Sequence, residues 1–296
     1  MELRHLEYFV AVAAERNFSR AAQRIHVAQS ALSASVGKLE KELNIELFDR
    51  SKRQIELTGA GEAFLQQARE VLLAAHRAQS SVDDYRGQLT GTVTLGTLMS
   101  WGSLNLAAAL EQFRRVNPRV TLRLRQSGTG SAGHLAAIAD GRMDLALVSI
   151  QSSPSPLVAL RELTQEPMVF LCESAHPLAQ RDHVRLSELD GEDLVQFPVG
   201  WGVRQRVDAA LAAAGVNPVS AYEVADYAIA AELVRHRLAT AILPVSAANR
   251  FPDLRQAPVH PPLTWTLYIA SAAPQYISRA AATLADTLVG LVDEIN

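Results

Sequence analysis

Apolar side chains recur at helical spacing in three successive segments of the first sixty residues. Between Leu3 and Ala14 they return every three or four residues, which predicts a helix. Asn17-Phe18-Ser19 interrupts the pattern, and Ser19 is a suitable N-cap for a second helix. A third helix is expected to begin near Ser30, with an inward face made of Leu32, Val36, Leu39 and Leu43. Two short strands around the polar tip Ser51-Lys52-Arg53 then predict a wing.

A long helix is predicted next, and Thr58 can cap it while Gly87 can end it. Its apolar positions alternate steps of four and three residues, the heptad spacing of a coiled coil. These positions are Phe64, Ala68, Val71, Ala75, Ala78, Val82 and Tyr85. The regular repeat favours a seam with a second copy of the chain. The alternative is an ordinary amphipathic helix packed on its own domain.

From about residue 89 onward, strand-like and helix-like segments alternate. Strands are expected at 92–96, 120–125, 144–149, 168–172, 194–197, 240–243 and 264–270. Helical periodicity occurs at 104–116, 131–140, 204–214, 226–237 and 275–292. Strands separated by helices indicate βαβ units and a mainly parallel sheet. The segment is long enough to form two lobes.

Length, composition and charge indicate what kind of protein the sequence encodes. The 296 residues are about twice a usual single domain, and 48% hydrophobic with 20% charged residues is typical of a soluble globular chain. The formal charge of −3 excludes a simple polycation that coats nucleic acid. The stretch 16–39 nevertheless carries Arg16, Arg20, Arg24 and Lys38 without a single acid. The charge pattern therefore predicts a local basic surface near the N-terminus.

The single cysteine, Cys172, excludes an intramolecular disulfide framework and suits a reducing compartment. It lies in the apolar run 169–172, so a core thiol is the simplest interpretation; a redox role would need an activated thiolate or a resolving partner. No apolar run approaches the roughly 18–20 residues that span a bilayer, and the N-terminus lacks a signal-peptide core. We therefore expect a cytoplasmic protein without membrane contact.

Two helices joined by the short turn His26-Val27-Ala28-Gln29 are typical of a helix-turn-helix, whose second helix enters the major groove. Gln29 can bond an adenine edge, and Ser30 and Ser33 can reach bases or phosphates. Lys38 is placed to donate to a phosphate or a guanine. The Lys52-Arg53 tip is placed to contact the DNA backbone or the minor groove. The alternative is a small helical protein-interaction domain with a solvated basic face.

Six short motifs occur in order at His5–Val12, Asn17–Ala22, Gln29–Ser33, Leu39–Leu43, Leu47–Arg50 and Leu57–Gly61. Together they resemble the N-terminal domain of the LysR-type transcriptional regulators. Landmarks of the same family recur at Gly91–Gly96, Gly141–Ala146, His176–Leu178 and Ile242–Pro244. The resemblance therefore spans the whole chain.

The resemblance implies an α/β fold class with three parts: a winged helix-turn-helix DNA-binding domain at 1–58, a linker (dimerisation) helix at 59–88, and a two-lobed, periplasmic-binding-protein-like effector domain at 89–296. Lobe I would comprise about 89–161 and 266–296, and lobe II about 162–265. The implied function is a ligand-responsive regulator that binds palindromic promoter DNA as a dimer or tetramer. It would respond to a small-molecule effector and act on RNA polymerase.

The same resemblance places the DNA-binding residues on the second and third helices and on the wing: Ser19, Arg20, Gln29, Ser30, Ser33, Ala34, Lys38, Arg50, Lys52 and Arg53. The chain departs from the family pattern at three positions. Ser30 stands where many relatives have proline, Ala34 where they often have arginine, and Gly37 where a basic residue is common. We therefore expect the operator to be read with fewer direct contacts than usual.

The segment 128–133 has the G-x-G-x-x-G spacing of a dinucleotide-binding loop, and it supports the rival function of a dinucleotide-dependent enzyme. No acid follows about twenty residues later to bind a ribose, so the motif is incomplete. The free N–H groups of such a helix start suit a small carboxylate or phosphate, or the glycines serve only backbone geometry. The eight histidines are scattered, and G-x-S-x-G and H-E-x-x-H are absent. We therefore expect no enzyme, no cofactor and no metal.

Ligands of open α/β sheets bind at the carboxyl ends of strands, and the resemblance points to the same loops. The effector-binding candidates there are Thr97, Leu98, Ser100, Trp101, Thr129, Ser131, Val199, Trp201 and Arg204. Hydroxyl and N–H donors suit a small organic anion, whose binding is expected to close the lobes. The alternatives are that the two tryptophans pack the lobes, that Arg204 only begins a helix, and that the effector domain serves oligomerisation alone.

Overall fold

The computed structural model describes residues 1–51, 54–84, 89–126, 130–151 and 154–293. The chain forms two compact units, Met1–Val82 with Ala139–Arg142, and Asp83–Ile138 with Met143–Asn296. Each unit has its own cluster of buried apolar side chains. The domain boundaries expected from the sequence at 58 and 88 stay predictions.

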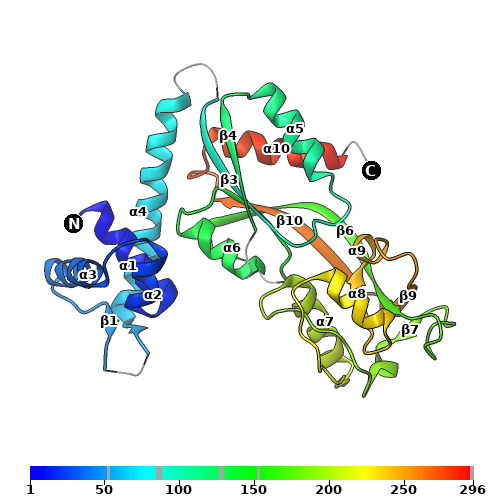
Figure 1. Ribbon diagram of the computed structural model, residues 1–296. Coiled ribbons are helices and arrows are strands. Elements are labelled where there is room, and N and C mark those ends of the chain that lie inside the picture. The colour runs from blue at the N-terminus through cyan, green and yellow to red at the C-terminus, as the bar shows by residue number, and fades with distance from the viewer. Residues whose placement is uncertain (52–53, 85–88, 127–129, 152–153, 294–296) are drawn as a thin grey trace. The chain divides into compact units, whose positions relative to one another are not determined.

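The N-terminal unit contains three short helices, a two-stranded wing and one long helix (Figure 1). The helices are α1 (Leu3–Glu15), α2 (Phe18–Arg24), α3 (Gln29–Leu43) and α4 (Gly59–Asp84). Strands β1 (Phe48–Asp49) and β2 (Glu56–Leu57) pair antiparallel, as the pattern predicts. The wing tip, Lys52 and Arg53, lies outside the described residues.

The core of this unit forms where the apolar faces of α1 and α3 meet the wing. Leu32, Val36 and Leu39 are fully buried on α3, while Leu43, expected beside them, is 37% exposed. The reason is that α3 ends at Leu43, where Asn44 takes the left-handed conformation. The Phe9 ring lies 5.3 Å from that of Phe48. The core therefore joins the first helix to the first strand of the wing.

Of the two N-caps predicted from the sequence, the one on α4 is confirmed and the one on α2 is wrong. Thr58 caps α4, because its Oγ1 accepts a hydrogen bond from the Gly61 N–H at 3.0 Å. Ser19 does not cap α2. Asn17 does so instead, since its extended backbone places Oδ1 3.0 Å from the Arg20 N–H. The expected end of α4, Gly87, lies outside the described residues.

The second unit is built on one mixed sheet with the strand order β4-β3-β5-β10-β6-β9-β7, in which β8 also pairs with β6. Its strands are β3 (Gly91–Thr97), β4 (Val120–Gln126), β5 (Leu145–Val148), β6 (Val158–Cys172), β7 (Val184–Arg185), β8 (Ala241–Pro244), β9 (Arg255–His260) and β10 (Thr264–Ala272). The expectation of a mainly parallel sheet is wrong. β10 and β6 run antiparallel to each other, and so do the pairs β10 with β5, β6 with β8, and β6 with β9.

Strands β6 and β10 are long enough to take part in both lobes (Figure 1). The first half of β6 pairs with the part of β10 that also pairs with β5 on its other side. These three strand segments belong to lobe I. The second half of β6 pairs with β8 and β9, which is lobe II. The sequence predicts only the second half of β6, because the first half carries the polar run 161–166. The expected strand at 194–197 forms only isolated bridges.

Helices pack against the sheet in this unit. They are α5 (Leu106–Val116), α6 (Gly130–Ala139), α7 (Gly202–Ala213), α8 (Tyr227–Arg235), α9 (Val245–Ala248) and α10 (Arg279–Asp293), with a 3-10 turn η1 (Leu186–Leu189). In lobe I, α10 packs against α5, β3 and β6; in lobe II, α8 packs against β6 and β8. Helices α5 to α8 and α10 agree with those expected from the sequence, except that α10 begins four residues later than expected; the sequence pattern does not predict α9 or η1.

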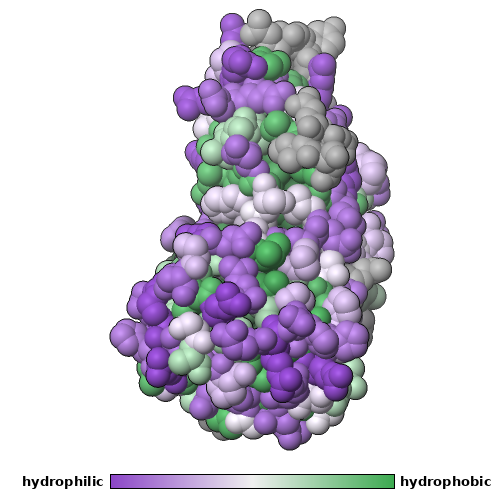
Figure 2. All heavy atoms as spheres, turned by 90° about the vertical axis from the view of Figure 1, so that its right-hand side faces the viewer, coloured by the Kyte–Doolittle hydropathy of each residue, from purple (hydrophilic) through white to green (hydrophobic). Residues whose placement is uncertain are grey.

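The surface of the chain is mostly polar on the face shown in Figure 2, where apolar side chains occur in small groups between hydrophilic ones. Among the described residues, no helix combines the length and the apolar composition that crossing a bilayer requires.

Candidate nucleic-acid interface and effector cleft

The recognition surface predicted on α3 is exposed on the folded unit. Gln29, Ser30, Ala34 and Lys38 are all exposed, and Ser33 is partly exposed, on the face opposite the buried Leu32 and Val36. Lys38 has no ion-pair partner among the described residues. The helix therefore presents amide, hydroxyl and ammonium groups to solvent, while its apolar side anchors it.

The start of α3 is also open to a ligand. Its N-cap, Ala28, makes no side-chain cap, so the first N–H groups of the helix have no such partner. The turn before it is tight because His26 adopts a positive φ of 56°. Uncapped N–H groups and the positive end of the helix dipole favour a phosphate at this position.

Two of the predicted DNA-binding arginines have partners inside the unit. Arg20 donates to the Glu15 carbonyl at 2.7 Å. Arg50 pairs with Glu40 at 2.7 Å, and Glu40 also accepts from the Leu47 and Phe48 N–H groups at 2.9 and 3.2 Å. Glu40 thus fixes the start of the wing, a role that the sequence did not indicate. Ser19, Arg20 and Arg50 are exposed, so contact with DNA stays a prediction for them.

The heptad positions of α4 divide into two groups. The Phe64 ring meets that of Phe9 at 5.2 Å, and Ala68 is 1% exposed in the core of the N-terminal unit. For these two residues the expected seam is corrected, because their side chains pack within the chain. Val71 is 43% exposed, Ala75 is partly exposed and Ala78 is exposed. The Val82 side chain and Tyr85 lie outside what the structure describes.

In the second unit, residues of both lobes surround a small cavity of about 20 Å³. Leu98, Ser100 and Gly130 line it from lobe I, and Trp201 and Tyr227 line it from lobe II. A cavity of about 10–15 Å³ is enough for one water molecule. In this arrangement the cleft therefore has no room for an organic ligand.

Two indole groups give the cavity unused hydrogen-bond donors. Trp201 and Trp265 both line it, and the buried Nε1 of each has no hydrogen-bond partner among the residues that the structure describes. The Trp201 ring stacks on Phe197 with centroids 6.0 Å apart, and Phe197 meets Tyr227 edge-on at 5.0 Å. The stack holds the Trp201 ring in lobe II. A buried N–H without a partner costs free energy, so this site favours a molecule that brings acceptors.

The other predicted effector residues lie mostly beside this cavity rather than on it. Arg204 bonds Asp208 and donates to the Phe197 carbonyl at 2.9 Å, with Glu223 at 3.6 Å. Its charge is thus compensated within lobe II, and its expected pairing with an effector carboxylate stays a prediction. Among the remaining candidates, Thr97 and Ser131 are buried, Trp101 is 37% and Val199 is 80% exposed, and Thr129 lies outside the described residues.

Gly130 of the glycine-rich segment, and Gly202 at the start of α7, lie where the backbones of the two lobes meet. Gly130 has a φ of 64°, and a Cβ there would lie 2.8 Å from the Gly200 carbonyl oxygen. A Cβ on Gly202 would lie 2.4 Å from the Ser149 carbonyl oxygen. Backbone of one lobe therefore touches backbone of the other at both helix starts. The part of the motif at 128–129 lies outside the described residues.

Comparison with protein families decides the identity of the chain. Residues 3–62 match the model described as "Bacterial regulatory helix-turn-helix protein, lysR family", and residues 86–292 match "LysR substrate binding domain". The chain belongs to the LysR family of bacterial transcriptional regulators. It is a ligand-responsive, DNA-binding regulator of the LysR type.

Individual relatives agree over nearly the full length. The transcriptional dual regulator GltC of Bacillus subtilis is 34% identical over 247 residues, covering 83% of this chain and 81% of GltC. A full-length OxyR of Pseudomonas aeruginosa superposes with a TM-score of 0.65 at 27% identity, over 97% of this chain and 94% of that one. Full-length CbnR complexed with its target DNA superposes with a TM-score of 0.56 at 25% identity, over 99% of this chain and 100% of CbnR. These relatives give the dinucleotide-dependent enzyme no support.

In this LysR-type effector domain, sequence reasoning found part of the cleft lining and missed the rest. Ser149 directly follows β5, so the rule that ligands meet the carboxyl ends of strands points to it as well. Trp265 lies inside β10 and Tyr227 begins α8, so no loop signal marks either one. Trp265 reaches the cavity because β10 takes part in both lobes, and Tyr227 reaches it from the start of α8.

Other reactive groups of this domain lie in its core. Cys172 is buried, and burial raises the pKa of its thiol to about 11, so the thiol stays protonated near neutral pH. Burial lowers the pKa of His134, whose Nδ1 lies 3.3 Å from the Leu147 carbonyl oxygen. No group of three metal-ligating side chains occurs among the residues that the structure describes.

Proposed function

We propose that α3 reads the operator in the major groove. The observation that carries this proposal is the exposed face of α3, which begins at Gln29 with an uncapped helix start and continues to the exposed Lys38. Ala34 offers only a methyl group, which suits contact with a thymine methyl. Lys52 and Arg53 are proposed to add contacts from the wing.

Gln29→Ala and Lys38→Ala should affect DNA binding in different ways. Loss of a base-reading amide removes about 1–3 kcal/mol of discrimination, so Gln29→Ala should reduce the ratio of specific to non-specific binding. Lys38→Ala should weaken binding to all sequences and lower the salt slope by about one unit if it contacts a phosphate. Fluorescence anisotropy with the DNA upstream of the protein's own coding region, against scrambled DNA, measures both effects. An unchanged specificity ratio for Gln29→Ala would contradict the proposal.

The regulator is further proposed to act as a dimer or tetramer, in the cytoplasm and on RNA polymerase. Support for oligomerisation comes from the C-terminal half of α4, where Val71 and Ala78 are exposed at heptad spacing. A two-fold assembly would present two α3 helices to the two half-sites of a palindrome. Phe64 and Ala68 have no part in the proposed seam.

We propose that the effector is a small organic anion bound between the lobes. Two helix starts, Gly130 of α6 and Gly202 of α7, line the cavity, and helix N-termini favour negative charge. The indole N–H groups of Trp201 and Trp265 add neutral donors. Since the observed cavity holds only about one water, binding is proposed to part the lobes, in contrast to the closure expected from the sequence.

Trp265→Phe should weaken binding of the effector by about 1–2 kcal/mol, because it removes one donor and keeps most of the ring. The measurement is calorimetric titration of the full chain with pairs of a carboxylic acid and its primary amide. An acid should bind more tightly than its amide, and Trp101→Phe, an exposed tryptophan that does not line the cavity, should bind like the wild type. Tighter binding of the amides would contradict an anionic effector.

A further inference from the structure

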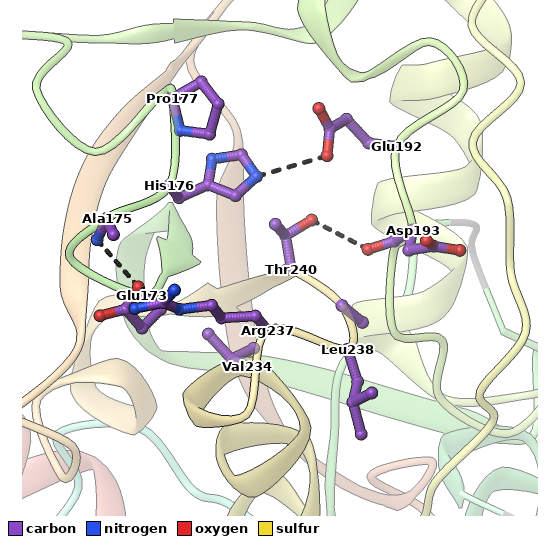
Figure 3. Close-up of a pocket in the computed structure, with 11 residues that line it drawn as sticks. Glu173, Ala175, His176, Pro177, Glu192, Asp193, Val234, Arg237, Leu238 and Thr240 are labelled. Atoms are coloured by element: carbon purple, nitrogen blue, oxygen red, sulfur yellow. Dashed lines mark hydrogen bonds and ion pairs between the residues drawn. The ribbon is translucent and has the colours of Figure 1, made fainter.

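A second cavity lies within lobe II, apart from the cleft (Figure 3). Its volume is about 210 Å³, against about 20 Å³ for the cleft cavity, and the two share no lining residue. It lies where β6 ends, where α8 ends, and just before β8 begins. None of the functions above uses it.

One wall of this cavity is an oriented guanidinium. The Arg237 Nε bonds the Glu173 carboxylate at 2.9 Å. Glu173 is itself held by the Ser174 hydroxyl at 2.6 Å and the Ala175 N–H at 2.8 Å, and these bonds lower its pKa. Glu173 therefore stays ionised and fixes Arg237. The two Nη groups of Arg237 bond nothing among the described residues, and the side chain is 69% exposed.

The opposite wall is negative. His176 Nδ1 accepts from the Leu178 N–H at 3.2 Å, and its Nε2 points at Glu192 from 3.4 Å (Figure 3). Asp193 lies next to Glu192. The C-terminal end of α8, at Val234 and beyond, adds the negative end of a helix dipole. This wall suits an ammonium group.

The lining holds three carboxylates, those of Glu173, Glu192 and Asp193, and they exceed its single guanidinium by two negative charges before His176 is counted. A ligand that carries only a carboxylate would meet this excess and be repelled. A simple amine would leave the two Nη groups of Arg237 unused. A zwitterion with one further positive charge satisfies both walls and halves the excess. Valine, leucine and proline side chains in the lining suit an aliphatic chain.

We propose that this cavity is a second ligand site for an α-amino acid with a basic side chain. Its carboxylate would bond the Nη groups of Arg237, and its cationic groups would lie against Glu192 and Asp193. The site is independent of the effector cleft and of the anion proposed there.

The test is calorimetric titration of the full chain with L-arginine and with agmatine, which lacks the carboxylate. Wild type should bind L-arginine about tenfold more tightly than agmatine, because the carboxylate adds a charged hydrogen bond and one such bond changes affinity by about this factor. Arg237→Asn removes the guanidinium and tolerates the local φ of 60°. It should abolish the preference for L-arginine, whereas agmatine, a dication without a carboxylate, should bind as tightly as before or more tightly because one positive charge has been removed. Glu192→Gln should weaken binding of both.

Two controls place the binding in lobe II. Arg250→Asn removes an exposed arginine of the same lobe outside the cavity and should bind L-arginine like the wild type. Trp265→Phe alters the cleft and should also leave L-arginine binding unchanged. The proposal is overturned if the wild type takes up no L-arginine at millimolar concentration, if Arg250→Asn weakens binding as much as Arg237→Asn, or if Trp265→Phe alone removes it.

Discussion

Val71→Asp should reduce the oligomer to a smaller assembly and strongly weaken operator binding. Val71 is 43% exposed on α4 at a heptad position, so in a two-fold seam it would meet its own copy. An aspartate there would bury two like charges, which costs several kcal/mol. Because linked DNA-binding heads gain affinity from their effective concentration, separating them should cost about 10²-fold or more in operator affinity. Light scattering and anisotropy measure the two effects.

The matched control for Val71→Asp is Gln79→Asp, which adds the same charge at an exposed position of α4 outside the heptad series. It should leave mass and affinity near those of the wild type. If Val71→Asp kept the wild-type mass, α4 would not form the seam, and the oligomer would have to assemble through another surface.

Gly202→Ala should destabilise the tight arrangement of the lobes and strengthen effector binding. The new methyl group would lie 2.4 Å from the Ser149 carbonyl oxygen and 2.6 Å from its Oγ. Such overpacking costs about 1–3 kcal/mol, so the variant should unfold at lower temperature. If the effector binds parted lobes, removing the competing tight state should tighten its apparent affinity by up to about 5- to 150-fold.

The control for this prediction is Gly290→Ala in α10, where an added Cβ meets nothing within 4 Å. Alanine is the better helix former by about 1 kcal/mol, so this variant should raise the unfolding temperature and leave effector affinity unchanged. Weaker effector binding by Gly202→Ala would mean that the liganded domain keeps the Gly202–Ser149 contact, and the proposal of parted lobes would be wrong.

Features that depend on local pattern could be predicted from the sequence. Helices α1 to α3, the wing strands and the Thr58 cap follow from apolar spacing and from side chains that bond their own backbone neighbours. The same holds for Leu32, Val36 and Leu39, whose burial follows from their helical spacing. The cap of α2 shows the limit of this approach, since Asn17 and Ser19 are both suitable and only the backbone conformation decides between them.

Features that depend on long-range pairing could not be predicted in this way. The sheet is mixed because β10, from the end of the chain, inserts antiparallel between β5 and β6, and no local signal specifies the partner of a strand. The heptad spacing of α4 is regular, yet Phe64 packs on Phe9 of the same chain because α1 lies beside it. Periodicity predicts which residues share a face and not what covers that face.

The sequence by itself determined that the chain has a helix-turn-helix, that the polar face of α3 is available to DNA, and that the chain resembles LysR regulators. These depend on short-range order and on motif residues that are close in sequence. Only the tertiary structure decided which groups remain free at the cleft. Arg204 is neutralised by Asp208 and Glu223, whereas the Trp201 and Trp265 N–H groups have no partner in the described part of the chain. Hydrogen bonds and ion pairs are satisfied by whatever folding brings near, so the unsatisfied ones are known only after the chain has folded.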